Sequence, residues 1–435
     1  MSTSFFSDIR KTDKHFWKVL ISSMIGNALE WYDFMLYGYC AAIIGMLFFP
    51  AHDAFSSMLA TYSVFFIGFI MRPLGGVLFG YLGDHIGRKR ALMWSIYCMA
   101  IPTALIGLLP TYAHIGWAAP VILTILRLLQ GLSMGGEFTG SIVFVVEHAD
   151  SRYRGFWGSW TTFSAAVGVL LGSSVCVAVG ALLSPSEVLR WGWRIPFVLS
   201  ITGSIVGAFV RNRLQETQAF EHNYRPKFSW SHLFNCYGTA LLQLICLDVV
   251  VAIGFFTICL FIVNYLQNFV GMSYYHATSI NSISTLGFAL SIPLSGYCSD
   301  LWGRKPMLRF ASLLLMLVAI PAFFVFSMGN LYQIFIVQLI LNIIFGMYFA
   351  VIPATIVELF PPHVRCLGVS LAHNVTMMVF GGTAPTLAVF LIKSTLVIGG
   401  RSLALATPGV YLALGALISF CATFWIKESH QKSIS

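Results

Sequence analysis

Two carboxylates stand inside the first long apolar segment of the chain, in the stretch GNALEWYDFMLYG at positions 26–38. Glu30, Asp33 and Tyr37 share one face of a helix there, because residues three and four positions apart are neighbours on a helix. A carboxylate near the middle of a bilayer costs roughly 2.5–3.5 kcal/mol on insertion scales, so it normally faces protein or water. We therefore expect Glu30 and Asp33 to line an internal wall that binds protons and a solute. The alternative is one interfacial acid and one structural hydrogen bond.

A second polar stripe lies between residues 118 and 147. Its members follow a spacing of three and four positions and form one helix face: Arg127, Gln130, Met134, Glu137 and Ser141. Arg127 and Glu137 are about 15 Å apart along the helix axis, too far to pair with each other. Each of the two charges therefore needs another partner. A static salt bridge between helices is the alternative to a functional role.

The composition places both stripes in a membrane. The chain has 435 residues, of which 58% are hydrophobic and 9% charged, whereas soluble domains are about 25% charged. Twelve spans of about 20 residues would use roughly 240 residues and leave short loops. The sequence predicts an all-α membrane protein with twelve transmembrane helices. We place them at about 19–48, 57–82, 91–110, 118–147, 156–183, 193–211, 238–268, 274–299, 306–328, 331–358, 366–392 and 404–427.

The basic residues predict the orientation of these helices. If the N-terminus is cytoplasmic, 19 of the 25 Lys and Arg fall in cytoplasmic segments and four in the opposite loops. The remaining two, Arg72 and Arg127, lie within helices. This asymmetry favours two cytoplasmic termini and explains the net charge of +9 better than nucleic acid does. The nine cysteines are scattered without a CxxC pair, so we interpret them as packing residues rather than disulfides or metal ligands.

The chain also repeats itself. GYLGDHIGRK at 80–89 returns as GYCSDLWGRK at 296–305. The repeat predicts two six-helix bundles, 1–210 and 238–435, joined by a cytoplasmic linker at 211–237. Parallel repeats of this kind place a substrate site between the halves near the middle of the membrane.

Charged residues recur at the predicted cytoplasmic helix ends. Glu147 stands seven positions before Arg154, and Glu358 stands seven before Arg365. We expect Glu147 to pair with Arg154 and the repeated charges to form a conformational latch, with topology alone as the alternative. The latch set is Asp84, Arg88, Glu147, Arg154, Asp300, Arg304, Glu358 and Arg365.

These motifs resemble the major facilitator superfamily, whose loop motif G-x-L-x-D-x-x-G-R-K-x-x-L is matched at 80–92. The resemblance covers essentially the entire chain. Four further segments are similar to the metabolite:proton symporter branch: GNALEWYD at 26–33, RPLGG at 72–76, GGE at 135–137 and WGWRIPF at 191–197. Three more are similar to its proline/betaine transporters: EFTG at 137–140, GFWGSW at 155–160 and PTLA at 385–388.

The resemblance implies a proton-coupled symporter of a small zwitterion such as proline or glycine betaine, working by alternating access in the bacterial inner membrane. Symport of a small carboxylate of the α-ketoglutarate, citrate or shikimate type is the alternative, with Arg127 and Arg72 as charge clamps. The sequence contains no HExxH, no GxSxG in a strand–turn–helix setting and no phosphate loop. We therefore expect no enzyme, no cofactor and no metal, and we expect a monomer in the lipid bilayer.

Helices 1, 4, 7 and 10 line the cavity in the superfamily, which implies that Glu30 or Asp33 is the partner of Arg127. We assign proton coupling to Glu30, Asp33 and Glu137. We assign substrate binding to the polar and aromatic set Trp31, Tyr37, Arg127, Gln130, Phe138, Tyr265 and Tyr348.

Three further polar residues in predicted helices are interpreted as structural rather than functional. Arg72 precedes Pro73, and we expect it to satisfy carbonyls freed by that proline. Asp248 is interpreted as an interhelical hydrogen bond. His373 could titrate near neutral pH, but a satisfied core histidine is the favoured interpretation.

Overall fold

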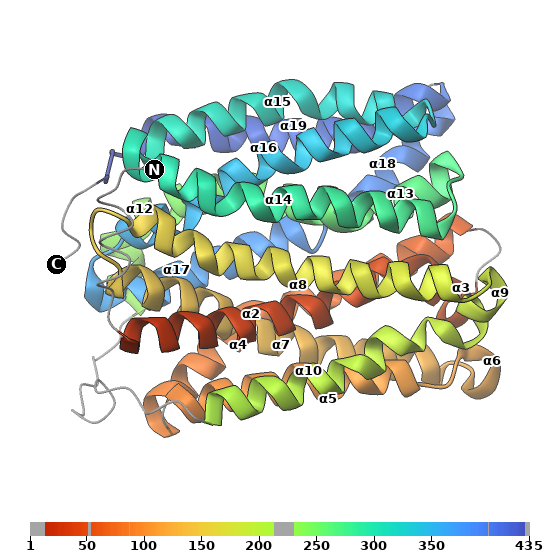
Figure 1. The fold of residues 1–435 in the computed structure, drawn as a ribbon, viewed down its shortest axis with the longest axis horizontal. Helices are drawn as coiled ribbons and strands as arrows, with labels where there is room; N and C mark the ends of the chain where they lie inside the picture. The colour runs from red at the N-terminus through yellow and green to blue at the C-terminus, as the bar shows by residue number, and fades with distance from the viewer. Residues whose placement is uncertain (1–13, 51–53, 87, 213–229, 399, 431–435) are drawn as a thin grey trace.

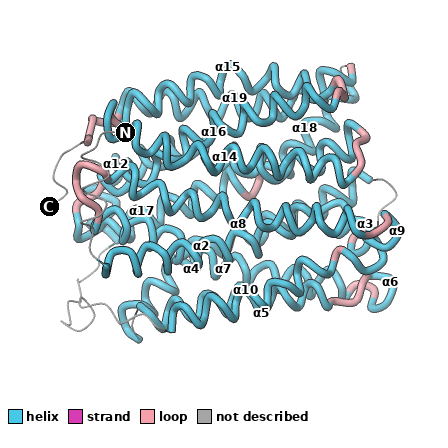
Figure 2. Tube along the Cα trace, in the orientation of Figure 1, coloured by secondary structure: helices cyan, strands magenta, loops and turns pink. Residues whose placement is uncertain are grey.

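The computed structural model describes residues 14–50, 54–86, 88–212, 230–398 and 400–430. In these ranges the chain is built of helices that run along the long axis of the molecule (Figure 1), and the loops gather mainly at its two ends (Figure 2). The first half contains α2 (Lys14–Tyr39), α3 (Ala41–Phe48), α4 (Ala54–Ile86), α5 (Arg88–Leu108), α6 (Tyr112–Ile115), α7 (Ala118–His148), α8 (Arg154–Leu182), α9 (Pro185–Glu187), the π-helical η1 (Val188–Gly192) and α10 (Arg194–Asn212).

The second half begins with a long, nearly continuous helix. It contains α12 (Trp230–Gly254), η2 (Phe255–Phe261), α13 (Ile262–Tyr265), η3 (Leu266–Val270), α14 (Tyr274–Trp302), α15 (Arg304–Ser327), α16 (Leu331–Glu358), α17 (Pro362–Thr376), η4 (Met377–Gly381), α18 (Ala384–Ile398) and α19 (Arg401–Trp425). Since α12 begins at Trp230, the predicted linker at 211–237 includes its first two turns. Residues 213–229 lie outside the described part.

Most of the long helices could each cross a membrane. Eight described helices are long and apolar enough to cross a bilayer, and the bent pair of α2 and α3 makes a ninth. The shorter apolar stretches of α5 and α10 and the 29-residue α14 complete the twelve expected spans of the described chain. The predicted all-α fold of twelve spans is confirmed.

The first span is not the single helix that was expected at 19–48, because it bends by 58° between α2 and α3. Asn264 of α13 causes the break. Its amide nitrogen donates to the Gly38 carbonyl at 2.7 Å, and its amide oxygen accepts from the Ala42 N–H at 3.2 Å. Those two backbone groups would otherwise bond to each other in an α-helix, so a side chain from the second half has been inserted into the ladder.

Glycines allow α4 and α7 to pack backbone against backbone. A Cβ atom at Gly131 would lie 1.7 Å from the Gly68 carbonyl oxygen, and one at Gly135 would lie 2.1 Å from the Arg72 carbonyl oxygen. Small residues are the usual means of such close approach in membranes. This close approach of α4 and α7 fixes the positions of Arg72 and Arg127 relative to each other.

The two halves touch at both ends of the molecule. At the end where α8, α15 and α17 begin, here called the basic end, α8 packs along α14, and Gly155 lies against Ser299 and Gly296. At the far end, Ser282 donates to Ser173 at 2.8 Å, and Asn264 holds the bend of the first span. The centre of the molecule is therefore enclosed from both directions.

Candidate functional site

Three buried carboxyl groups line one small recess in the first half. Glu30 and Asp33 of α2 face Glu137 of α7 across it, and each side chain is about 4% exposed. Ser95 donates to a Glu137 carboxylate oxygen at 2.8 Å, and the recess has room for about one water molecule. The residues assigned to proton coupling are thus brought together, and an exchangeable proton can be held among them.

Arg127 lies outside this recess, in an aromatic cage. Its guanidinium carbon is 4.4 Å from the ring centre of Phe34, 4.5 Å from that of Tyr37 and 5.1 Å from that of Phe65. Nη1 donates to Gln130 at 2.7 Å, and Gln130 donates to Thr103 at 2.7 Å. Each cation–π contact of a desolvated guanidinium contributes about 2 kcal/mol.

The expected pairing of Arg127 with Glu30 or Asp33 is wrong in this structure. No carboxylate of the described residues pairs with Arg127, and its Nε and Nη2 have no hydrogen-bond partner there. The reason is the antiparallel course of α2 and α7. It brings Glu137 level with the two acids and Arg127 level with Tyr37, one to two turns farther along.

Arg72 of α4 lies at the interface of the halves and is fully buried. Its Nε donates to the Asn374 side chain of α17 at 3.1 Å, not to a carbonyl freed by Pro73, so that expectation is wrong. Asn374 in turn donates to the Gly135 carbonyl at 2.6 Å. Nη1 and Nη2 of Arg72 find no hydrogen-bond partner among the described residues. Its charge interacts with Glu30 from the first half and Asp248 from the second.

An aromatic cluster joins the two halves, and it is linked to Arg72 through Phe69, whose ring centre is 5.4 Å from the Arg72 guanidinium carbon and 5.0 Å from the ring of Phe256. The ring centre of Trp31 is 4.5 Å from that of Phe255 in η2 and 5.6 Å from that of Phe138 in α7. The Phe138 ring is 5.4 Å from the imidazole of His373. Trp31 and Phe138, both assigned to substrate binding, therefore lie together at the interface. The face of a tryptophan or phenylalanine ring attracts a quaternary or secondary ammonium group.

Tyr265 and Tyr348, two more aromatic residues of the predicted substrate set, have hydroxyl groups bonded to backbone carbonyls of the second half. Tyr265 donates to the Leu405 carbonyl at 2.9 Å and packs against Phe323 inside the second half. Tyr348 donates to the Leu247 carbonyl at 2.7 Å. Both hydroxyl groups are thus already used in holding helices of the second half together.

His373 and Asp248 form a buried pair. The interhelical hydrogen bond expected of Asp248 is present, and its partner is His373. His373 Nδ1 is 2.7 Å from Asp248 Oδ2, and both side chains are at most 2% exposed. The pair joins α17 to α12 near Arg72. Its two members are 125 positions apart, so no local pattern links them.

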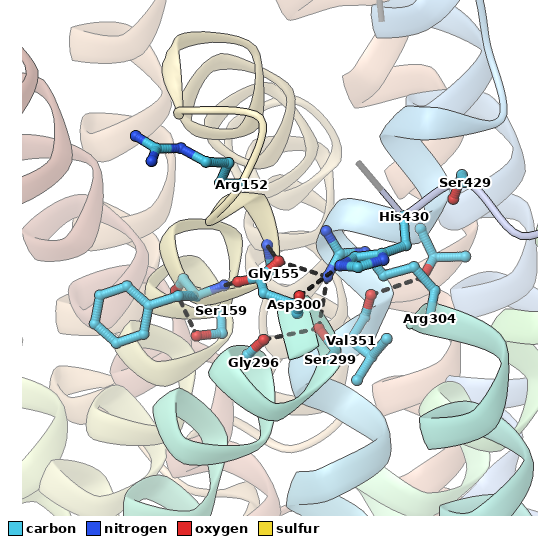
Figure 3. A network of polar contacts seen from close by, with 12 residues as sticks. Arg152, Gly155, Ser159, Gly296, Ser299, Asp300, Arg304, Val351, Ser429 and His430 are labelled. Atoms are coloured by element: carbon cyan, nitrogen blue, oxygen red, sulfur yellow. Dashed lines mark hydrogen bonds and ion pairs between the residues drawn. The ribbon is translucent and has the colours of Figure 1, made fainter. Parts of the chain in front are cut away.

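The latch residues whose side chains the structure describes converge at the basic end, where Figure 3 shows the network around Asp300. Asp300 accepts from the backbone N–H groups of Gly155 and Phe156 at 2.8 and 2.7 Å. The carboxylate of the second half thus binds the N-terminus of α8 in the first half, where the helix dipole favours negative charge. Arg304 lies 2.7 Å from Asp300 and 3.5 Å from Glu358.

The remaining charges pair between the halves. Glu147 Oε1 is 2.6 Å from Nη1 of Arg365, so the expected partner of Glu147, Arg154, is wrong. Arg154 interacts electrostatically with Glu358 of the second half. Glu358 stands seven positions before Arg365, the residue of the second half that corresponds to Arg154. The side chains of Asp84 and Arg88, the first-half copy of the motif, lie outside the described residues.

The last described residues complete this network. Glu428 accepts from the N–H groups of Arg304 and Lys305, both at 3.0 Å, and so caps α15. Ser429 donates to Glu358, and His430 contacts the Asp300 carbonyl. Burial by itself would raise the pKa of Glu428, but the backbone N–H donors and the Arg304 charge lower that pKa below its ordinary value. No group of three metal-ligating side chains occurs in the described part of the chain.

Comparisons with known proteins agree with this architecture. Residues 18–225 match the family model described as "Sugar (and other) transporter", and residues 244–434 match "Major Facilitator Superfamily". The proline/betaine transporter of Escherichia coli K12 is 34% identical over 96% of this chain and 84% of that protein. The glycine betaine/proline/ectoine/pipecolic acid transporter of Dickeya dadantii shows the same identity and coverage.

Among solved structures, a proton:xylose symporter bound to 6-bromo-6-deoxy-D-glucose superposes with a TM-score of 0.77. The superposition covers 97% of this chain and 98% of the symporter chain. At 14% sequence identity, it supports the fold alone. The charged motifs, the twelve spans and the relatives agree. This chain is a multi-pass membrane protein and not an enzyme, and it belongs to the major facilitator superfamily of transporters, with that family's two six-helix bundles.

Proposed function

We propose that this chain carries a small zwitterion such as proline or glycine betaine together with protons, by alternating access, across the bacterial inner membrane. The observation that carries the proposal is Arg72. This buried guanidinium stands between the halves, over the Phe69 ring, with two η nitrogens that have no hydrogen-bond partner among the described residues. A buried charge without full hydrogen bonding is costly, and a bound carboxylate would relieve that cost.

The zwitterion would bind with its two charges on different surfaces. Its carboxylate would accept two parallel hydrogen bonds from the fork of Arg72. Its ammonium group would lie against Trp31 and Phe138, whose faces suit a cation that cannot donate many hydrogen bonds. Binding between the halves would then favour the closed arrangement, in which Trp31 also contacts Phe255.

Proton coupling is assigned to Glu30, Asp33 and Glu137. Their convergence on one recess supports the assignment, and Glu30 interacts electrostatically with Arg72. A proton on Glu30 would therefore alter the charge balance around the substrate carboxylate. Tyr37 and Gln130 would act indirectly, by fixing Arg127.

A second candidate function is symport of a small dicarboxylate. It is favoured by the two buried guanidinium groups, Arg72 and Arg127, neither of which pairs with a carboxylate of the described residues. Arg127, however, already contacts three aromatic rings and donates to Gln130, whereas Arg72 lies between the halves and contacts one ring. Proline or betaine therefore remains the leading substrate class.

Alternating access would use the network at the basic end as its gate. We place that end, both termini and the linker at 211–237 in the cytoplasm, and we place the halves at 1–210 and 238–435. The ion pair of Glu147 with Arg365 and the contact of Asp300 with α8 would break when this end opens. We propose a monomer as the working unit.

Uptake into proteoliposomes tests the proposal. Labelled proline, glycine betaine and α-ketoglutarate would be offered side by side, with and without an imposed inward proton gradient. We expect the gradient to stimulate uptake of proline or betaine and not of α-ketoglutarate. Stimulated uptake of α-ketoglutarate alone would support the second candidate function. Uptake at the same rate with and without the proton gradient would contradict symport.

A further inference from the structure

The buried pair of His373 and Asp248 lies in the second half, apart from the acidic recess of the first. An ionised carboxylate only accepts hydrogen bonds, so with Asp248 ionised the 2.7 Å contact assigns the hydrogen to Nδ1 of neutral His373. Nε2 then holds a lone pair. Neither Nε2 nor the second Asp248 oxygen has a hydrogen-bond partner among the described residues. Both atoms are buried and free to take up a proton.

The surroundings of the pair contain one strong charge. From α4, Arg72 interacts electrostatically with Asp248 and also with Glu30 of α2. From α16, Tyr348 faces Asp248 with its hydroxyl already donated to Leu247. These groups and the pair itself form a row across the interface of the halves.

The side of α7 that meets the pair is uncharged. It presents Phe138, whose ring is 5.4 Å from the His373 imidazole. Its neighbour Glu137 lines the recess of the first half and accepts from Ser95 there. From α17 itself, Asn374 is bound to Arg72 and to the Gly135 carbonyl. Arg72 is therefore the charge to which the pair responds.

The charges of the three groups that meet here can be counted. Asp248 contributes one negative charge when ionised, Arg72 contributes one positive charge, and neutral His373 contributes none. If a substrate carboxylate binds Arg72, it adds a negative charge in a buried place, which is unfavourable. One proton on the pair then restores neutrality.

We propose that the His373–Asp248 pair carries a transported proton in the second half, and that a substrate carboxylate on Arg72 promotes its uptake. The inference rests on the proposed function and deepens it. On the side of entry, Nε2 takes a proton from water and forms an N–H bond, leaving an imidazolium beside the Asp248 carboxylate. When the substrate leaves on the other side, the same N–H bond breaks and the proton returns to water. Because coupling is reciprocal, the proton also tightens substrate binding.

The test uses the full-length protein in proteoliposomes with labelled proline or betaine, whichever the wild type accumulates. The variants are His373→Gln and Asp248→Asn, with His276→Gln, an exposed histidine at the far end, as the control. We expect gradient-driven accumulation to fall about tenfold or more in both pair variants while measurable counterflow persists. The KM of counterflow should depend on pH in the wild type and His276→Gln, and lose that dependence in His373→Gln.

Two outcomes overturn the inference without touching the proposed function. One is wild-type accumulation and an unchanged pH profile in both pair variants. The other is a parallel loss of counterflow and accumulation in variants whose thermal unfolding matches the wild type, which would mark the pair as a structural element of the site. If a proton gradient does not stimulate uptake by the wild type, the proposed symport itself is contradicted, whatever the pair variants do.

Discussion

Glu147 and Arg365 are 218 positions apart in the chain, yet their side chains form an ion pair with 2.6 Å between Oε1 and Nη1. Glu147 lies in the last turn of α7 and Arg365 in the first turn of α17, so the pair ties the first half to the second at the basic end. Arg365 is held in place because its Nε donates to the carbonyls of Val357 and Phe360.

Breaking this pair should favour opening of the basic end. Glu147→Gln should weaken the closed arrangement by about 1 kcal/mol, because the Glu147 side chain is 32% exposed and solvent screens the interaction. A cysteine at Ser159, which is buried against Gly296, would report opening in a background without the nine native cysteines. We expect faster maleimide labelling of that cysteine in Glu147→Gln.

The matched control is the exposed pair of Asp150 and Arg152, at 2.9 Å on the same end of the protein. Asp150→Asn should leave the labelling rate at its wild-type value, since this pair lies within one loop. Equal rates in all three proteins would remove Glu147 and Arg365 from the gate.

Substitution of the two buried arginines should separate their roles. Arg72→Lys removes the fork that binds a carboxylate through two hydrogen bonds, and should raise the KM for proline or betaine about tenfold or more. Arg127→Lys keeps a cation inside the aromatic cage and should change KM less. The opposite ranking in initial-rate kinetics would assign the substrate carboxylate to Arg127.

The acidic recess should be required for coupling. Glu30→Gln and Asp33→Asn should each abolish gradient-driven accumulation while allowing exchange of substrate across the membrane, because the neutral amides cannot carry the proton. Ser204→Ala, at a hydroxyl that lines the same recess, is the control and should accumulate substrate. Full accumulation in both acid variants would exclude these residues from the mechanism.

A methyl group at Gly131 should destabilise the first half. The added Cβ would meet the Gly68 carbonyl at 1.7 Å, and such overpacking costs about 3 kcal/mol or more. Gly140→Ala on the same helix is the control, because a Cβ there meets nothing within 4 Å. We expect a lower melting temperature in detergent for Gly131→Ala alone, and similar melting of the two variants would contradict the close packing of α4 and α7.

The Glu428 contact should depend on pH with a defined sign. Because the pKa of Glu428 is lowered in the folded protein, its contribution is fully present above the ordinary glutamate value of about 4.3 and is lost as the pH falls through the lowered pKa. Hydrogen exchange at the Arg304 and Lys305 amides, corrected for intrinsic rate, measures it. Protection should persist from pH 5 to 8 and fall in Glu428→Gln, whose amide keeps only one acceptor oxygen for the two N–H groups.

Glu187→Gln provides the control for this experiment. Glu187 is another capping glutamate, bonded to Ser184 at the far end, and its loss should leave the Arg304 and Lys305 amides protected. Protection that survives Glu428→Gln would show that the terminal residues do not hold α15.

The fold could be predicted from the sequence because its causes are local and repeated. Apolar segments of membrane length gave the twelve spans, and the repeated motif gave the two halves. In the second copy, Gly303 adopts φ of 99°, as the tight turn of that motif requires. The bend of the first span could not be predicted, because Asn264 causes it from a distant helix.

The partners of the charged side chains could not be predicted for a similar reason. Spacing placed Glu30, Asp33 and Glu137 on inward faces, and they do meet. The partner of Arg127 instead depends on how far α2 and α7 are shifted along each other, and the residue pattern of a single helix does not contain that information. The duplicated sequence held one usable signal that was missed. Glu147 and Arg154 recur as Glu358 and Arg365, so each acid can pair with the arginine of the other half, as Glu147 does with Arg365.

The most direct test of the central claim is the movement of protons when substrate alone provides the driving force. Proteoliposomes with equal pH on both sides and an internal pH dye would receive proline or glycine betaine outside. Symport predicts acidification of the interior that follows substrate entry, disappears with a protonophore and is absent in Glu30→Gln. Entry of labelled substrate with a constant internal pH would contradict it.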